Sequence, residues 1–401
     1  MTARHRPFGL KLAVAGALSG VLAALLATLG CGGGGGLTVT DTTPTAPAGA
    51  WQWSLPAGFP VPAVPADNPM SEARVDLGRF LFYDKRLSGN GTQACAGCHL
   101  QSKAFTDGFM VSRGSTGEFT HRSAQTLANA AYHPTITWAN PSLLSLERQM
   151  EVPLFGENPV EMGVNDGNKA EVLLRLNAVP EYPAKFAAAF AGETDPVSWA
   201  NVIKAIASFQ RALVSGNSRY DQFQAGKTTL TPAETRGMNL FFGEKAECFH
   251  CHGSFNFNDQ VIHASTRVLE TPFHNTGLYN IGGTGAFPEP NRGVFELTGL
   301  PKDMGMFRAA SLRNIELTAP YMHDGSIATL EDVLDFYAAG GRNITSGPHA
   351  GDGRLNPNKS DLITLITLDA QEKADIVAFL KTLTDHEFIT NPKFADPFAA
   401  K

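Results

Sequence analysis

Cysteine and charge are both scarce in this sequence, and their scarcity limits what the protein can do. Only five of the 401 residues are cysteine, charged residues make up 17%, and the net charge is -6. A protein that binds nucleic acid needs a basic field, so this charge balance argues against a nucleic-acid partner. No long run of one sign is present, so charge identifies no other partner either. The chain is nevertheless long enough for two domains with hydrophobic cores.

The first 31 residues are typical of an export signal. An Ala/Leu/Val-rich run over 12–29 follows three cations: Arg4, Arg6 and Lys11. The run ends at Gly30-Cys31, which is similar to the lipidation site of bacterial lipoproteins, although Thr28 stands where such sites have leucine. We therefore predict a signal peptide over 1–31 and a lipid anchor at Cys31, on the periplasmic side. An uncleaved membrane anchor is the alternative, and it delivers the chain to the same side.

The segment 32–50 is expected to be a flexible linker. Five glycines follow Cys31, and a Thr/Pro/Ala/Gly-rich stretch continues to Ala50. Such a composition cannot bury a core. Folded structure should therefore begin near Trp51.

The four remaining cysteines form two pairs that point to covalently bound heme. Each pair has C-x-x-C spacing and is followed at once by histidine, at 95–99 and at 248–252. Disulfides would suit an exported protein but do not explain the two histidines. Zinc would accept four cysteines and two histidines, yet adjacent Cys and His fit one tetrahedral metal poorly. The C-x-x-C-H pattern is instead that of c-type heme attachment.

The two motifs also belong to an internal repeat. Residues 78–82 (GRFLF) precede the first motif as residues 237–241 (GMNLF) precede the second, and 105–107 (FTD) resembles 257–259 (FND). We predict two cytochrome c-like heme domains related by internal duplication, over 51–219 and 220–401.

Helical signals dominate between the motifs, whereas strand signals are few and short. Capping boxes at 231–234 and 369–372 each open a helix, and two more helices are expected over 169–176 and 197–213. The second box is followed by an apolar stripe of Ile376, Phe379, Leu380 and Leu383. Long Gly/Pro/Asn-rich loops such as 275–303 connect these elements. The fold should be mainly α, with long loops that wrap a cofactor.

In a c-type motif the two thiols bond to the heme vinyl groups and the histidine supplies a nitrogen to iron. The predicted attachment residues are Cys95, Cys98, Cys248 and Cys251, and the predicted iron ligands are His99 and His252. The chemistry then depends on what faces the opposite side of each iron.

Over about 68–385 the chain resembles the bacterial diheme cytochrome c peroxidases and MauG. The resemblance is carried, in order, by Trp138, Gln149, Pro153 and the segments 159–163 (PVEMG), 273–278 (FHNTGL), 312–314 (LRN) and 317–326 (LTAPYMHDGS). Within this superfamily the chain is most similar to the MbnH-like diheme enzymes found with methanobactin-type copper genes. The resemblance implies two heme c groups and one Ca²⁺.

Tyr337 distinguishes the branches of this superfamily. Thr329 can cap a helix that places Tyr337 on its apolar face, and from periodicity alone Tyr337 is a core residue. The resemblance instead implies an iron ligand, because the peroxidases have methionine at this position and MauG-like enzymes have tyrosine. A phenolate oxygen favours Fe(III) and higher states, whereas a thioether favours Fe(II). A Tyr337-ligated second heme would thus favour oxidation of a difficult substrate over peroxide scavenging.

The resemblance makes the first heme the peroxide site. Glu161 corresponds to the distal carboxylate that moves a proton between the peroxide oxygens, with Gln149 beside it. A one-residue insertion after Trp138 weakens the match for Gln149, and without the resemblance both are solvated loop residues. His121 could be a sixth ligand, but its surroundings differ from the peroxidase loop, so we expect a surface histidine and an open iron.

Further roles follow only from the resemblance. Trp138 would lie between the hemes and pass charge by transient oxidation, although a buried tryptophan is more often simply core. Calcium would be bound by Asn129 and by the backbone carbonyls of Thr318 and Pro320. His323 would lie at the edge of the second heme. MauG has a tryptophan two residues before its second motif as a surface exit for charge, and Ala246 stands there in this chain.

Three functions are compatible with these features. The first is a hydrogen peroxide-dependent oxidase that acts through a high-valent diheme state. It would oxidise a residue, tryptophan to kynurenine by the MbnH resemblance, on a periplasmic copper-binding protein encoded nearby. The second is a cytochrome c peroxidase that reduces hydrogen peroxide with electrons from a small cytochrome. The third is a non-catalytic diheme electron carrier, which would need two six-coordinate irons.

Overall fold

The computed structural model describes residues 51–399. The predicted signal peptide, the anchor residue Cys31 and the linker 32–50 lie outside the described residues. Within residues 51–399, no helix is both long enough and apolar enough to cross a bilayer.

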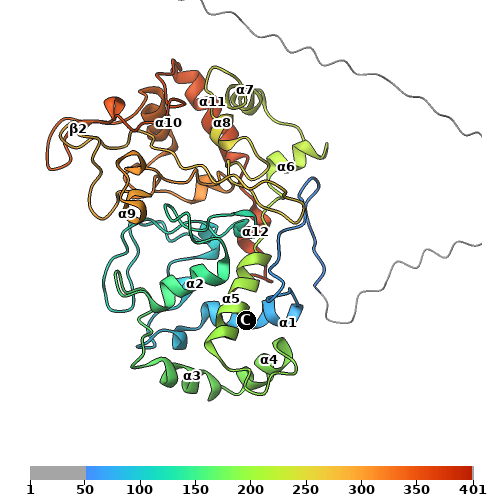
Figure 1. Cartoon of the computed structure of the whole chain (residues 1–401). Coiled ribbons are helices and arrows are strands. Elements are labelled where there is room, and N and C mark those ends of the chain that lie inside the picture. The colour runs from blue at the N-terminus through green and yellow to red at the C-terminus, as the bar shows by residue number, and fades with distance from the viewer. Residues whose placement is uncertain (1–50, 400–401) are drawn as a thin grey trace, which may run out of the picture. The chain divides into compact units, whose positions relative to one another are not determined.

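The described chain is mainly helical, with long connecting loops, as expected (Figure 1). Its α-helices are α1 (Glu72–Tyr83), α2 (Leu146–Phe155), α3 (Lys169–Asn177), α4 (Glu181–Ala189), α5 (Trp199–Ala212), α6 (Arg219–Gln224), α7 (Pro232–Phe241), α8 (Phe249–His252), α9 (Phe295–Thr298), α10 (Leu330–Ala338), α11 (Ala370–Lys381) and α12 (His386–Thr390). The strands in the described residues are the short antiparallel pair β1 (Asn343–Ile344) and β2 (Gly351–Asp352).

The predicted helix starts are confirmed by their caps. The side chains of Thr231 and Asp369 each accept a hydrogen bond from the third helical residue, and a Glu at that position closes the capping box of α7 and α11. Thr329 caps α10 in the same way through the N–H of Asp332. The apolar stripe of α11 is buried, since Ile376 and Phe379 are both 0% exposed. The periodicity therefore located the core face of this helix correctly.

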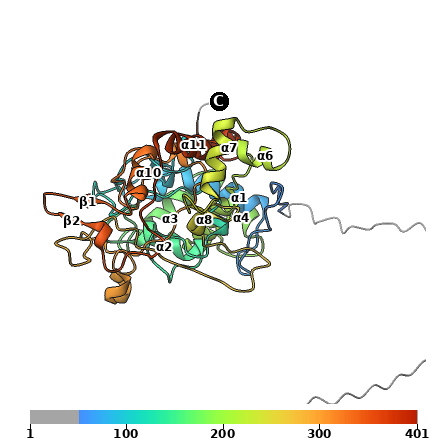
Figure 2. The same cartoon turned by 90° about the horizontal axis from the view of Figure 1, so that it is seen from above.

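Two helix pairs form the centres of the two halves. In the N-terminal half (51–219) α1 packs on α5 (Figure 1). In the C-terminal half (220–399) α7 packs on α11 (Figure 2). A glycine permits each close approach. A Cβ on Gly78 would lie 1.9 Å from the carbonyl oxygen of Ala205, and one on Gly237 would lie 1.8 Å from that of Asp375. These glycines open the repeated GRFLF and GMNLF segments, so the sequence repeat coincides with a repeated helix contact.

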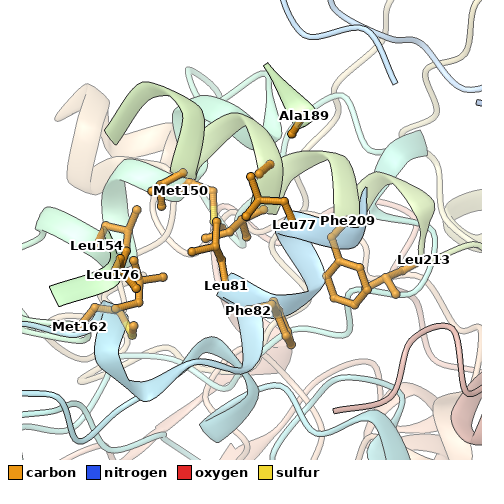
Figure 3. Close-up of a cluster of buried hydrophobic side chains, with 14 of the residues drawn as sticks. Leu77, Leu81, Phe82, Met150, Leu154, Met162, Leu176, Ala189, Phe209 and Leu213 are labelled. Carbon is orange, nitrogen blue, oxygen red and sulfur yellow. The ribbon is translucent and has the colours of Figure 1, made fainter. Parts of the chain in front are cut away.

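Each half has its own hydrophobic core. The first core surrounds α1 and includes Leu77, Leu81 and Phe209 (Figure 3). The second surrounds α7 and α11 and includes Phe241 and Phe379. The domain boundary at 219/220 stays a prediction.

Two segments lie in the core of the opposite half. Trp138 and Ala139 pack in the second core, although they precede residue 220. Phe388 of α12 is 2% exposed in the first core. The hydroxyl of Tyr83 on α1 also donates to the carbonyl oxygen of Phe394 at 2.7 Å. The end of the chain therefore completes the N-terminal half.

Candidate heme sites

Each motif histidine is anchored through one ring nitrogen. Nδ1 of His99 lies 2.7 Å from the carbonyl oxygen of Phe105, and Nδ1 of His252 lies 2.9 Å from that of Phe257. A carbonyl only accepts hydrogen bonds, so both Nδ1 atoms carry the proton and Nε2 keeps its lone pair for a metal. Burial lowers the pKa of both imidazoles, which favours the neutral, ligating form.

The backbone that anchors these histidines is unusual in both halves. Phe105 has φ of 64° and Phe257 has φ of 53°, in the left-handed region that non-glycine residues rarely adopt. Both rings are buried, which holds this conformation in place. The strained residue turns its carbonyl toward the imidazole, so the repeated FTD and FND segments orient the two predicted iron ligands.

The four motif thiols are unpaired, so the structure gives no support to a disulfide at either motif. Zinc also lacks its ligands. Among residues 51–399, the side-chain groups close enough to share a metal are Cys251 with Asp259 and His274, and Glu244 with Glu247 and His250. Neither group contains two cysteines, and neither contains His99 or His252, as the zinc interpretation requires.

A cavity of ≈ 250 Å³ at the second motif has the donor groups that a heme requires. Its walls include Cys248, Cys251 and His252 from the motif, with Tyr337, Trp138 and His323 from other segments. Thiols, an imidazole nitrogen and a phenol thus face one largely apolar space. This combination suits an iron porphyrin that is bonded to the two thiols and held by His252 and Tyr337.

Tyr337 reaches the cavity because α10 turns its apolar face inward. Leu334 on the same face is 6% exposed, and Gly340, with φ of 70°, ends the helix. Burial raises the pKa of Tyr337, and the nearby Cys251 and Cys248 thiols raise it further. Its hydroxyl has no hydrogen-bond partner among residues 51–399, so the oxygen is free to bind a metal.

Glu161 lies at the first motif, on a loop whose backbone is held on both sides. Its carbonyl oxygen accepts from the N–H of Ser115 at 2.7 Å, and the next N–H, of Met162, donates to Pro153 at 2.9 Å. Burial raises the pKa of Glu161 to about 6. Burial raises the pKa of Cys95 and of Cys98, and the charge of the Glu161 carboxylate adds to both shifts, so this carboxylate lies near the two thiols. A carboxyl with this pKa beside the motif can take up and return a proton near neutral pH.

Gln149 and His121 have less defined surroundings. Gln149 is partly exposed on α2, and its side chain has no hydrogen bond within the described residues. His121 is partly exposed, and its carbonyl oxygen accepts from Asn291 at 2.8 Å. The role predicted for Gln149 stays a prediction.

Trp138 and His323 both line the second cavity. The indole Nε1 of Trp138 donates to the carbonyl oxygen of Ser123 at 2.9 Å. His323 is 4% exposed and stacks on Phe307 with ring centroids 3.6 Å apart. Desolvation lowers the pKa of His323 to about 4, so its ring is neutral, and its Nε2 has no hydrogen-bond partner in the described chain. The position of His323 suits the predicted contact with the second heme.

The three predicted calcium ligands have different surroundings. Thr318 and Pro320 line the second cavity. The amide of Asn129 is fully buried, donates to Ser215 and Asn256, and accepts from the N–H of Ser215 at 2.8 Å. This network explains the burial of Asn129 without a metal, and the calcium site stays a prediction.

Two groups in or near the second cavity were not predicted from the sequence. His274 and Asp259 form an ion pair of 2.5 Å that raises the pKa of His274 to about 10. Both residues belong to segments singled out in the sequence, 273–278 and 257–259, so a signal for this pair was present. Arg308 lines the cavity with 5% exposure, and no sequence pattern marked it.

Comparison with known proteins agrees with these features. The family model described as di-haem cytochrome c peroxidase matches residues 72–229. The cytochrome-c peroxidase IdrP1 of Denitromonas iodatirespirans is 37% identical over 340 residues, which cover 81% of this chain and 85% of that protein. MauG of Methylorubrum extorquens is 33% identical over 322 residues, covering 80% of each chain. The crystal structure of a MauG-like protein associated with microbial copper homeostasis is 60% identical, with a TM-score of 0.86, and covers 87% of this chain and 100% of that one.

The fold and the two histidine-anchored sites define a diheme oxidoreductase. The chain belongs to the family of the di-haem cytochrome c peroxidases and MauG. It is therefore an enzyme with two heme groups, and the interpretation as a non-catalytic carrier is not supported.

Proposed function

We propose that this enzyme uses hydrogen peroxide to oxidise a residue on a partner protein. The observation that carries the proposal is the free hydroxyl of Tyr337 in the same cavity as His252. A hard oxygen ligand opposite the histidine suits a metal that stores oxidising equivalents rather than one that accepts electrons from a donor cytochrome. Peroxide and a protein partner in general are what the peroxidase and MauG relatives imply.

We further propose that the partner is a periplasmic copper-binding protein and that the modified residue is tryptophan, converted to kynurenine. The support is the 60% identity to a MauG-like protein associated with microbial copper homeostasis. Ala246 is 4% exposed where MauG has its exit tryptophan, so the path of charge to this partner differs from that of MauG.

The residues at the two sites would have different roles in the reaction. The hemes supply the redox chemistry with peroxide. At the first site, Glu161 would accept a proton from bound peroxide and return it to the departing oxygen. At the second, His252 and Tyr337 would hold the metal, and Trp138 would form part of the cavity wall. The proposal includes covalent attachment through both cysteine pairs, a calcium ion and a lipid anchor at Cys31 on the periplasmic side.

Mass spectrometry of the partner tests the function. The product of the gene beside this one is incubated with the purified enzyme and hydrogen peroxide, then digested and sequenced by mass. We expect the mass of one tryptophan-containing peptide to change as conversion to kynurenine requires, and only when enzyme and peroxide are both present. An unmodified partner under conditions of full peroxide consumption would contradict the proposal.

Cytochrome c peroxidase activity is the second candidate, favoured by the 37% identity to a cytochrome-c peroxidase. Rapid peroxide reduction with a small reduced cytochrome as donor would support it. The two candidates are separated by measuring donor oxidation and partner modification on the same enzyme preparation.

A further inference from the structure

Arg308 is a buried cation without a counter-anion in the wall of the second cavity. Its Nη2 donates to Oε1 of Gln125, while its Nε and Nη1 have no hydrogen-bond partner among residues 51–399. It also forms no ion pair with any carboxylate in that part of the chain. Desolvation lowers the pKa of Arg308 to about 10, so the guanidinium is still protonated at neutral pH. A buried, charged donor with two free nitrogens needs an anion.

The neighbouring titratable groups do not supply one. Asp259 raises the pKa of Arg308, but the protonated His274 contacts its Oδ2 at 2.5 Å and offsets its charge, and its Oδ1 makes no hydrogen bond to Arg308 or to any other group among residues 51–399. His133 is buried, and its pKa lies well below the usual value because of desolvation and the Arg308 charge, so it is neutral. The positive charge of Arg308 is therefore directed at the cavity.

The occupant of this cavity carries suitable anions. A heme has two propionate carboxylates, and a carboxylate matches the planar fork of a guanidinium. We propose that Arg308 binds a propionate of the second heme and that Gln125 holds Arg308 in the position to do so. This inference rests on heme occupying the second cavity and is independent of the protein substrate.

Gln125 would make this contact a link between the two sites. Its side chain accepts from Arg308 at the second cavity, while its backbone faces the His99 ring at the first site. At the second site the backbone of Ala310 faces His252 in the same way, but the alanine side chain is too short to contact a residue of the first site. Gln125 and Arg308 thus join the two sites through one side-chain hydrogen bond.

The test is the midpoint potential of each heme in the purified holoenzyme, measured by spectroelectrochemistry across a pH series. Heme content is measured alongside as pyridine hemochrome. A nearby positive charge stabilises the reduced heme, so Arg308→Gln should lower the potential of one heme at neutral pH. The propionate, now buried and unpaired, should also gain a higher pKa. The potential of that heme should then fall as pH rises through this new pKa, whereas the corresponding wild-type profile is flatter.

Three variants make the test decisive. Arg308→Lys keeps the charge and should restore most of the potential and the flatter profile. Gln125→Ala should shift the same heme in the same direction by a smaller amount. The matched control is Arg354→Gln, because Arg354 is paired with Asp352 at 2.6 Å on the surface and does not line the second cavity, and its removal should leave the pH profile unchanged.

The inference is overturned if fully loaded Arg308→Gln protein has wild-type potentials and pH profiles. If that variant does not assemble, an unchanged potential and pH profile in fully loaded Gln125→Ala protein overturns it equally. A heme content below two per wild-type enzyme molecule would contradict the assignment of two hemes. Failure to modify the partner protein would leave this inference standing.

Discussion

The backbone carbonyl oxygen of Trp138 accepts a hydrogen bond of 2.8 Å from the backbone N–H of Arg308. Trp138 belongs to the N-terminal half and Arg308 to the C-terminal half, so this bond joins the two at the wall of the second cavity. The indole is fixed as well, through the bond from Nε1 to Ser123. Trp138 is thus held at both its backbone and its ring where charge would pass between the sites.

Trp138→Phe should separate the structural role of this residue from its redox role. Phenylalanine keeps most of the buried ring but is much harder to oxidise. We expect the wild-type enzyme to form a long-lived high-valent diheme state with peroxide, and Trp138→Phe to lose this state while keeping normal heme content and near-normal stability. The measurement is stopped-flow absorption after addition of peroxide. A wild-type spectrum and lifetime in this variant would exclude charge transfer through Trp138.

Tyr337→Met should change the second heme from an oxygen-ligated to a sulfur-ligated site. Because a thioether favours Fe(II), we expect a higher midpoint potential for that heme and loss of partner oxidation. Spectroelectrochemistry and the partner mass assay provide the two readouts. Tyr337→Phe, which removes only the oxygen, is the matched control. It should also stop partner oxidation without giving a thioether signal, and partner oxidation at the wild-type rate in both variants would contradict the role of Tyr337.

The rate of the peroxide reaction should decrease on the acid side of its pH profile, near the Glu161 pKa of about 6. The carboxylate form accepts the proton, so the rate should fall as pH decreases through this value. Glu161→Gln should slow the reaction about 10²- to 10⁴-fold and abolish this decrease. Stopped-flow rates over a pH series provide the measurement. A decrease that persists in Glu161→Gln would assign it to another group.

The raised pKa of Glu161 also predicts that Glu161→Gln, which slows the reaction, makes the folded protein more stable. The folded pKa is raised above the ordinary 4.5, so the loss of folding free energy on ionisation of Glu161 builds up between pH 4.5 and about 6 and is complete above that pH. Glu161→Gln should therefore be more stable than wild type above pH 6, by at most about 2 kcal/mol. The gain should vanish below pH 4.5. Denaturant unfolding of the two proteins at both pH values checks this.

Gly237→Ala should destabilise the C-terminal half. The new methyl group would lie 1.8 Å from the carbonyl oxygen of Asp375, so α7 and α11 must move apart. We expect a loss of about 3 kcal/mol or more, as for other overpacked contacts. Thermal unfolding provides the measurement. The matched control is Gly167→Ala, whose nearest neighbour would be 3.2 Å away, and an equal loss in both variants would rule out the helix contact as the cause.

Asn129→Ala should destabilise the chain whether or not calcium is bound. The variant loses three buried hydrogen bonds, each worth about 1 kcal/mol. Unfolding is compared with and without a calcium chelator. If the loss appears only in the presence of calcium, Asn129 acts mainly as a calcium ligand.

The sequence predicted what depends on local pattern. The caps at Thr231 and Asp369, the inward face of α10 and the two heme motifs all rest on residues close together in the chain. The sequence shows that Gly78 and Gly237 occupy equivalent positions in the repeat. Only the packed helices show why, since each glycine lies against the backbone of the neighbouring helix.

Features that depend on distant segments were beyond sequence reasoning. No sequence motif marks Arg308. The lack of a counter-anion beside it depends on His133 and Asp259, which are far from it in the sequence. The left-handed backbone of Phe105 and Phe257 could not be foreseen either, since phenylalanine disfavours it and burial and backbone hydrogen bonds from other residues maintain it.

The route of the C-terminus has a consequence for biosynthesis. Gln101, two residues after the first motif, donates to the carbonyl oxygens of Phe388 and Asn391. The scaffold of the earlier motif is thus incomplete until the final residues have been synthesised and, in an exported chain, translocated. A nascent chain should therefore present the Cys95 motif in a loosely folded form, accessible to the heme-attachment machinery, and a premature stop codon near residue 385 should impair the motif farthest from it.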